Sequence, residues 1–436
     1  MDANGIRLRP AKTEAAALQS TTTAPTTTTT TPPAKQRSHP GGASQHGSLM
    51  QAWRIISMNV YFLASCLCMH ATQFMGVPLY FYDRDLYYSW QALTKQHFGL
   101  LVVTLQAWWS PTLVRVSGDE SVRGQLRRME DGRLELEFPE RMVLLSNHII
   151  YTDWLYLWWS AYAANMHGHI YIILKESLKY IPILGPGMMF FSFVFLSRNW
   201  TQDKPRFQHR LKKLTNKHKG PTKGSKMLDP MWLLLFPEGT NISKNGRAKS
   251  KAWAEKSGQP DLDHCLLPRS TGLLFTLDEL GDSIEWVYDC TLAYEGIPQG
   301  EYAQDVFTLR GIYLQGRSPP SVNMHWRRFA VKDIPVHDPK AFERWVLMVW
   351  QTKDELLKYY AQHGGFPADE ATEYKDIPLG AGVKEMYKAP GWIGTTVVPR
   401  YRLEFLQIFA PVAAMGLVGH LVWRFWKWGV IALGSI

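Results

Sequence analysis

The stretch from Leu144 to Trp159 reads LLSNHIIYTDWLYLWW and holds two ionisable side chains, His148 and Asp153, among aliphatic and aromatic residues. Burying such groups is costly unless they are paired with one another or with other polar groups. The run RMVLLSN that leads into them is typical of a buried strand, and it ends in Ser146 and Asn147, which favour turns and helix caps. The sequence therefore predicts a strand, a polar turn and a helix in immediate succession.

The segment TDWLYLWWSAYAA predicts a helix with Thr152 or Asp153 in its first turn. On one continuous helix, a separation of five residues would place His148 and Asp153 about 140° apart. The two side chains can meet only if His148 lies in the loop before the helix and folds back over its first turn. Asp153 would then fix one imidazole nitrogen, and the other could take a proton from a hydroxyl group. A purely structural His–Asp pair is the alternative on this pattern alone.

Four further apolar runs, HIYIIL, WLLLFPEGT, WVYDCTLAYEG and SVNMHWRRFAV, alternate with longer helical patterns between residues 115 and 400. This alternation predicts an α/β domain with a central, mostly parallel sheet flanked by helices. The sequence shows no internal repeat.

Hydrophobic segments flank this predicted domain. No Asp, Glu, Lys or Arg occurs from Ile55 to Tyr82 or from Phe98 to Val114, and the first run is long enough to cross a bilayer. We expect a two-helix membrane anchor over residues 51–114, with the second helix only partly inserted, although two buried core helices are the alternative. Phe405 to Trp423 predicts a further membrane or interfacial helix within residues 401–436.

The first 50 residues are rich in Thr and Pro, and we expect them to be disordered because they have little to bury. The chain of 436 residues has a net charge of +10 and 18 Trp residues, which suits an anionic membrane or nucleic acid. We do not expect nucleic-acid binding, because no motif of that kind occurs. Four cysteines, none in a C-x-x-C pair, predict neither a metal site nor a disulfide framework, and we expect Cys265 and Cys290 to pack rather than react.

Three other segments carry polar residues next to apolar runs. LLLFPEGTNIS places Glu238, Gly239 and Thr240 after a strand, where a glycine lets an anion approach the backbone, although an ordinary turn explains it equally well. KYIPILGPGMMFFSFVFLSRNW contains Arg198 near its end, which either extends its side chain toward a membrane surface or holds an anion. LLPRSTGL is a proline-containing turn that says little in isolation.

Taken together, and in their order along the chain, the four segments resemble the four sequence blocks of the glycerolipid acyltransferase superfamily. NHIIYTD resembles its Asn-His-x-x-x-x-Asp block, FLSR the second block, FPEGT the third and LLPRSTG the fourth. ILKESLKYIP, SKAWAEKSG, VYDCTLAYEG and VNMHWRRFAVKDIP resemble the branch of animal lysocardiolipin and fungal lysophosphatidylinositol acyltransferases. One departure is Asn241, which stands where many relatives carry an arginine and thus removes one possible phosphate contact.

The resemblance implies transfer of an acyl group from acyl-CoA, as a co-substrate, to a hydroxyl of a lysophospholipid. It implies that His148 is the catalytic base and that Asp153 orients it. It also implies substrate-binding roles for a second group of residues, namely Asn147, Arg198, Glu238, Gly239, Thr240, Pro268 and Arg269. No bound cofactor or metal is expected.

The segment from Lys204 to Lys226 has nine Lys and Arg and no acidic residue. Phe207, Leu211 and Leu214 recur at helical spacing, and Pro205 suits the start of a helix. Contact with anionic lipid and a simple solvated charged face are both consistent with this pattern.

The sequence thus predicts a membrane-bound enzyme that remodels phospholipids, with lysophosphatidylinositol or lysocardiolipin as the favoured acceptor. A phosphatidic-acid-forming enzyme and a catalytically inactive lipid-binding or scaffold protein are the alternatives. We expect the endoplasmic reticulum or another endomembrane, with the mitochondrial membrane less favoured. A group of arginines after the second apolar run favours a cytosolic catalytic domain, namely Arg115, Arg123, Arg127 and Arg128.

Overall fold

The computed structural model describes residues 39–434, apart from 198, 222–223, 225–226 and 368–391. Most of the tail expected over residues 1–50 therefore lies outside the described residues. The described part of that tail is attached to the domain, because the backbone N–H of Gln45 donates to the carbonyl of Gln315. A helix already begins at Ser48.

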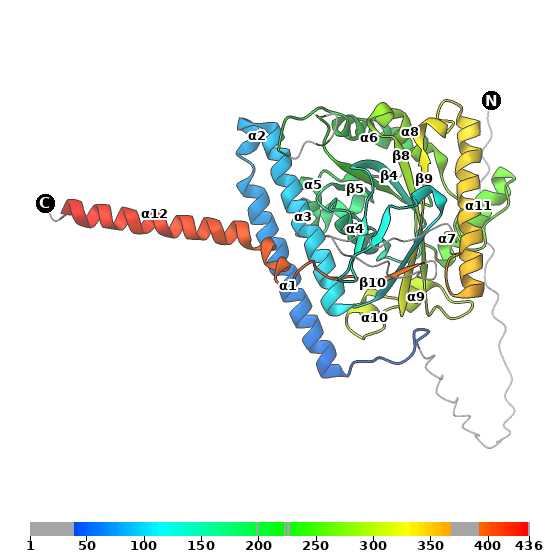
Figure 1. Cartoon of the computed structure of the whole chain (residues 1–436), viewed down its shortest axis with the longest axis horizontal. Helices are drawn as coiled ribbons and strands as arrows, with labels where there is room; N and C mark the ends of the chain where they lie inside the picture. Colours follow the sequence, from blue (N-terminus) through cyan, green and yellow to red (C-terminus); the bar gives the residue numbers. More distant parts are fainter. Residues whose placement is uncertain (1–38, 198, 222–223, 225–226, 368–391, 435–436) are drawn as a thin grey trace, which may run out of the picture. The chain divides into compact units, whose positions relative to one another are not determined.

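An eight-stranded sheet forms the centre of the domain, with strand order β10-β1-β9-β8-β4-β7-β5-β6 (Figure 1). β4 runs parallel to both of its neighbours, β7 and β8, and β5 runs parallel to β6 and β7, whereas β9 is antiparallel to β8. The predicted mostly parallel α/β sheet is confirmed. The strands are β1 Leu113–Gly118, β4 Arg141–Ser146, β5 Ile170–Lys175, β6 Val194–Leu196, β7 Met231–Leu235, β8 Trp286–Tyr294, β9 Ser321–Ala330 and β10 Ile393–Thr396, and a separate hairpin pairs β2 Leu126–Arg128 with β3 Leu134–Leu136.

Helices cover both faces of this sheet. In β4, Met142 and Leu144 belong to one hydrophobic core, whereas Val143 and Leu145 belong to a second core. Successive strand residues point to opposite faces, so both faces of β4 are buried and its sequence is continuously apolar. α3 and α4 contribute to the first core, and α6, α8 and α11 contribute to the second. The helices are α1 Ser48–Met75, α2 Leu79–Tyr82, α3 Arg84–Trp109, α4 Asp153–Ala163, α5 Leu184–Phe190, α6 Trp200–Leu214, α7 Lys244–Ser257, α8 Ser270–Leu280, α9 Ala303–Val306, α10 Leu309–Tyr313, α11 Pro339–His363 and α12 Ala410–Gly434.

Among the described residues, one helical segment, Ser48–Tyr82, is long and apolar enough to cross a membrane, and 22% of its most apolar stretch is buried within the protein. The second expected membrane helix falls in α3, which packs on the domain instead. Leu101 and Val103 of α3 are fully buried, and a side chain at Gly99 would collide with the indole of Trp158 in α4. The alternative of a buried core helix therefore describes α3, because its apolar run faces α4 and not the surroundings.

The first half of the basic segment, residues 204–214, forms the C-terminal part of α6. Phe207 and Leu211 are buried, so the apolar stripe packs against the domain as its spacing predicts. The predicted start at Pro205 is wrong, because α6 begins at Trp200 and Pro205 lies within its second turn. Contact of its exposed lysines with lipid stays a prediction.

Candidate active site

The loop between β4 and α4 brings His148 against the first residue of the helix. His148 Nδ1 lies 2.7 Å from Asp153 Oδ2. β4 ends at Ser146 and α4 begins at Asp153, so the imidazole folds back over the start of the helix. The predicted pairing is confirmed, and it exists because the two residues do not share one continuous helix.

Three further groups hold the carboxylate of Asp153. Its Oδ2 accepts from the backbone N–H of Ile149 at 2.6 Å and of Ile150 at 3.0 Å, and its Oδ1 accepts from the hydroxyl of Tyr294 at 2.6 Å. Burial and the adjacent Asp153 raise the pKa of Tyr294 well above its usual value, so the hydroxyl stays a donor. The Asp153 side chain is fully buried, which fixes the direction from which it meets His148.

The imidazole keeps one nitrogen free. The His148 side chain is 20% exposed, and its Nε2 makes no hydrogen bond to any of the described residues. When Nδ1–H donates to Asp153, Nε2 is the unprotonated nitrogen and can accept a proton. The ring of Phe236 stacks on the imidazole at a centroid distance of 4.4 Å and restricts its rotation.

The segment after β7 packs against the His148 loop. The backbone N–H of Ile242 donates to the carbonyl of His148 at 2.8 Å, and the backbone N–H of Arg269 donates to the carbonyl of Pro237 at 2.9 Å. Three of the four sequence blocks therefore meet at the C-terminal edge of β4 and β7. In open α/β sheets, this is the edge at which ligands bind.

Glu238 lies beneath this surface. Its side chain is buried, its Oε1 accepts from Trp350 Nε1 at 3.3 Å, and burial raises its pKa to about 8. The carboxyl is thus mainly protonated at neutral pH, and it joins the turn after β7 to α11. These contacts show that Glu238 holds two elements of the protein together. Its contact with substrate stays a prediction.

The neighbouring turn residues are more accessible. Gly239 is exposed and has a φ of +72°, a backbone conformation that glycine adopts without strain. Its N–H already donates to the carbonyl of Phe236, so it offers a ligand open space rather than a donor. Thr240 and Pro268 are half-buried and Arg269 is exposed, which leaves all three within reach of a ligand at this edge.

Of two further predicted binding residues, one is buried and the other lies outside the described residues. Asn147 is fully buried, and its amide both donates to and accepts from the backbone of Leu292 at 3.0 and 2.8 Å. It therefore fixes the turn to β8, and its contact with substrate stays a prediction. Arg198 lies outside the described residues, two positions after the end of β6. Asn241 donates to Gln304 at 2.6 Å and so turns toward the protein.

Sequence reasoning missed the contribution of α11. Asp354 accepts from the backbone N–H groups of Asp263, His264 and Cys265, the loop that leads into Pro268. On the same helix, Lys353 binds the buried Asp289 at 2.8 Å. α11 thus braces both the fourth block and β8, although its sequence carries no recognisable motif.

The cysteines play no visible part in this site. Cys265 and Cys290 are fully buried, and burial raises the pKa of each thiol well above its usual value, which confirms that they pack. No group of three or more His, Cys, Asp or Glu side chains suited to a metal ion occurs in the part of the chain that the structure describes.

Comparison with known families identifies the family of this chain. A family profile described as acyltransferase matches residues 114–291, and one described as acyltransferase C-terminus matches residues 313–383. The chain belongs to the glycerolipid acyltransferase superfamily. The first match covers all four blocks of the acyltransferase, and the second covers α11, which braces them.

Several curated relatives of this acyltransferase have named activities. The chain is 36% identical to 2-acyl-1-lysophosphatidylinositol acyltransferase of Saccharomyces cerevisiae over 64% of this chain and 77% of that protein. It is 33% identical to probable 1-acyl-sn-glycerol-3-phosphate acyltransferase 5 of Arabidopsis thaliana, over 54% of this chain and 57% of that protein. It is 31% identical to lysocardiolipin acyltransferase 1 of Gallus gallus, over 52% of this chain and 55% of that protein.

Proposed function

We propose that this acyltransferase transfers an acyl group from acyl-CoA to a free hydroxyl of a lysophospholipid. The observation that carries the proposal is the His148–Asp153 pair with a free Nε2 at the C-terminal edge of the sheet. The names of the relatives support the acceptor class, because they refer to lysophosphatidylinositol, lysocardiolipin and 1-acyl-glycerol 3-phosphate, which each lack at least one acyl chain of the complete phospholipid. An inactive scaffold would not require an imidazole that is both oriented and partly exposed.

In the proposed reaction, His148 Nε2 removes the proton of the acceptor hydroxyl as its oxygen attacks the thioester carbonyl. The C–S bond then breaks, and the proton on His148 passes to the leaving thiolate of CoA. A thiol with a pKa of about 8.5 leaves readily, so the alcohol is the partner that needs activation. A positioned base of this kind typically contributes about 10²–10⁴-fold to the rate.

Lysophosphatidylinositol is the acceptor we favour, with lysocardiolipin next. The Saccharomyces cerevisiae relative named for lysophosphatidylinositol is 36% identical to the chain, against 33% for the Arabidopsis thaliana relative named for acylglycerol phosphate and 31% for the Gallus gallus relative named for lysocardiolipin. The remodelling of existing phospholipids is therefore favoured over the synthesis of phosphatidic acid, which remains the second candidate.

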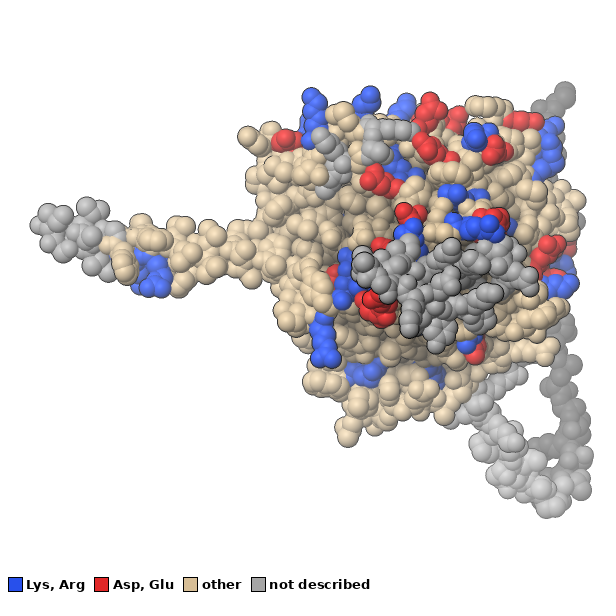
Figure 2. Space-filling view, viewed as in Figure 1, with Lys and Arg blue, Asp and Glu red and all other residues tan. Residues whose placement is uncertain are grey.

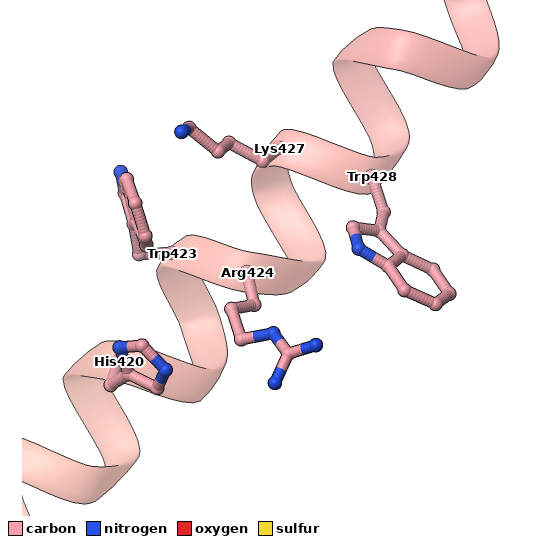
Figure 3. Close-up of a pocket in the computed structure, with 5 residues that line it drawn as sticks. All are labelled: His420, Trp423, Arg424, Lys427 and Trp428. Atoms are coloured by element: carbon pink, nitrogen blue, oxygen red, sulfur yellow. The ribbon is translucent and has the colours of Figure 1, made fainter.

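We further propose that the enzyme works at a membrane surface. The face formed by α1 and α3 carries few charged side chains (Figure 2), and α1 exposes Val60, Leu63 and Leu67. α12 exposes apolar side chains along most of its length, and His420, Trp423 and Lys427 project together on one side of it (Figure 3). A lysine beside an indole suits the head-group layer, and here the Lys427 ammonium lies 4.2 Å from the Trp423 ring centre.

An endomembrane such as the endoplasmic reticulum, with the catalytic domain in the cytosol, is the location that fits this proposal. Acyl-CoA is supplied from the cytosol, and the arginines that follow α3 favour that side.

A panel assay tests the proposal. The purified enzyme in nanodiscs receives labelled oleoyl-CoA with lysophosphatidylinositol, lysocardiolipin, lysophosphatidic acid or lysophosphatidylcholine. We expect a labelled diacyl product, with the highest kcat/KM for lysophosphatidylinositol. The same panel without the enzyme gives the background, and the absence of acylation of every lysophospholipid would refute the proposed activity. Preference for lysophosphatidic acid would instead favour phosphatidic acid synthesis.

A further inference from the structure

A cavity lies at the opposite edge of the sheet from His148. It is lined by residues at the starts of three strands, Arg141 of β4, Tyr171 of β5 and Met231 of β7, together with the start of α3 and the end of α6. His148 lies beyond the other end of β4. Because a strand rises about 3.3 Å per residue, the length of β4 alone separates the two places by roughly 17 Å. The cavity is therefore distinct from the candidate active site.

The cavity carries an excess of positive charge. Its lining includes six Lys and Arg against two Asp. Both carboxylates are already engaged by one imidazole, because His218 Nδ1 lies 2.9 Å from Asp85 and His218 Nε2 lies 3.3 Å from Asp229. Arg141 is also engaged, since its guanidinium donates to backbone carbonyls that include those of Ser283 and Leu214.

The other five cations make no ion pair with any described carboxylate within 4.0 Å. They are Arg84, Lys95, Arg210, Lys213 and Lys217. They come from α3, from α6 and from the loop after α6, so three separate segments bring positive charge to one cavity. Such an arrangement is unfavourable when the cavity is empty and favourable when an anion occupies it.

Lys95 is the deepest of these cations. Its side chain is only 3% exposed, and its Nζ lies 3.5 Å from the centre of the Tyr171 ring. Burial lowers the pKa of Lys95 to about 7, and the more distant Asp229 opposes that shift only in part. A buried ammonium without a carboxylate partner is costly. An anion that enters this cavity therefore stabilises the charged form of Lys95.

The cavity also lies next to the segment that is able to cross a membrane. Tyr80 of α2 and Phe190 of α5 belong to its lining, and Phe81 and Tyr82, which follow Tyr80, are strongly exposed. Aromatic side chains of this kind favour the head-group layer of a bilayer. A lipid phosphate could therefore reach the cavity as directly as a soluble phosphate ester could.

We propose that this cavity is a second ligand site, which binds a phosphate group carried by an anionic phospholipid or by a soluble phosphate ester. Lys95 provides the innermost positive charge, and Arg210 and Lys213 at the end of α6 provide the outer ones. The site is independent of the proposed chemistry at His148.

Binding to the full-length enzyme tests the proposal. Glycerol 3-phosphate is titrated into the enzyme in phosphatidylcholine nanodiscs, and in a second arm phosphatidylglycerol is included in the nanodisc. Binding is followed by calorimetry in the first arm and by the rise in Tm in the second. The His148→Ala variant is measured beside the wild type in both arms. Binding that differs between the two proteins is assigned to the active site, and binding that is the same in both is assigned to the cavity. Binding in the first arm identifies a soluble ester as a ligand, and stabilisation in the second arm alone identifies a lipid.

We expect Lys95→Gln and the double variant Arg210→Gln/Lys213→Gln each to weaken binding at least about 10-fold, because each removes charge-assisted hydrogen bonds to phosphate. Lys249→Gln/Lys251→Gln on α7 removes two exposed charges away from the cavity and is the matched control. If Lys95→Gln fails to fold, the double variant decides alone, because Arg210 is half-buried and Lys213 is exposed. The absence of binding in both arms, or unchanged binding in the cavity variants, would overturn the proposal.

Discussion

At the residue scale, the site is organised around Asp153. This carboxylate meets His148, two backbone N–H groups and the hydroxyl of Tyr294 at once, so it has no freedom to turn away from the imidazole. An orienting carboxylate must hold one tautomer of histidine and one ring direction, and a carboxylate with four donors does both. The distinction between a structural and a catalytic pair therefore depends on the free nitrogen of His148 and not on Asp153.

Glu238 makes a pH-dependent contribution to stability. Burial raises its pKa to about 8 in the folded enzyme, whereas a glutamate in an unfolded chain titrates near about 4.3. The stabilising contribution of this carboxyl is complete below the unfolded pKa, falls as the pH rises toward 8, and is lost above it. Glu238→Gln lacks this dependence, so we expect the Tm of the variant minus that of the wild type to increase from pH 5 to pH 8.

The increase should reach at least about 3 °C, since about 1 kcal/mol shifts the Tm of a domain of this size by roughly 2–4 °C. Glu355→Gln, on the exposed side of α11, is the matched control and should show no such trend. A Tm difference for Glu238→Gln that stays constant between pH 5 and pH 9 would contradict the buried, protonated state.

At the element scale, α11 supports the candidate site from the second core. Asp354 accepts three successive backbone N–H groups of the loop before Pro268, at 2.6 to 3.1 Å. We expect Asp354→Ala to lower the Tm by several degrees, because three backbone N–H groups lose their acceptor and one of them belongs to the buried Cys265. A buried donor that loses its partner costs about 1–3 kcal/mol. Thermal unfolding monitored by intrinsic fluorescence measures this directly.

The same variant should also raise KM, because the loop that carries Pro268 and Arg269 loses its support. Glu355→Ala changes the neighbouring exposed residue and should leave Tm and KM as in the wild type. Equal Tm values for both variants would show that α11 does not brace this loop.

The strands could be predicted from the sequence and the role of several helices could not. β4 and β7 are almost continuous apolar runs because both of their faces are buried, and β8 is apolar apart from Asp289 and Thr291, so the sequence predicts all three strands. A charge-free run looks the same whether it faces lipid or a protein core, so the sequence leaves both readings open for the second apolar run, and only the packing of α3 against Trp158 favours the core. The contacts of Tyr294 and Asp354 join segments far apart in sequence, so no local pattern could reveal them.

At the scale of the whole molecule, α1 is the element we expect to hold the enzyme in the membrane. Substitution of its exposed residues by lysine in the triple variant Val60→Lys/Leu63→Lys/Leu67→Lys should release the protein from membranes that are washed with urea at neutral pH, where lysine is charged. Each charge costs roughly 2.5–3.5 kcal/mol at the centre of a spanning helix. Sedimentation after the urea wash measures the fraction released.

Three exposed apolar residues outside α1 provide the control, Leu309→Lys/Met348→Lys/Val398→Lys. This control should remain with the membrane pellet. Retention of the α1 variant in the pellet would show that another segment, such as α12, is the principal anchor.

The central claim is that the free nitrogen of His148 activates the acceptor hydroxyl. The most direct measurement is kcat for acyl transfer from oleoyl-CoA to the preferred lysophospholipid by His148→Ala. His363→Ala, an exposed histidine at the end of α11, is the control, and the Tm of each variant reports folding. We predict a fall in kcat of at least about 100-fold for His148→Ala, an unchanged Tm, and full activity for the control. A folded His148→Ala enzyme with a kcat close to that of the wild type would contradict the account.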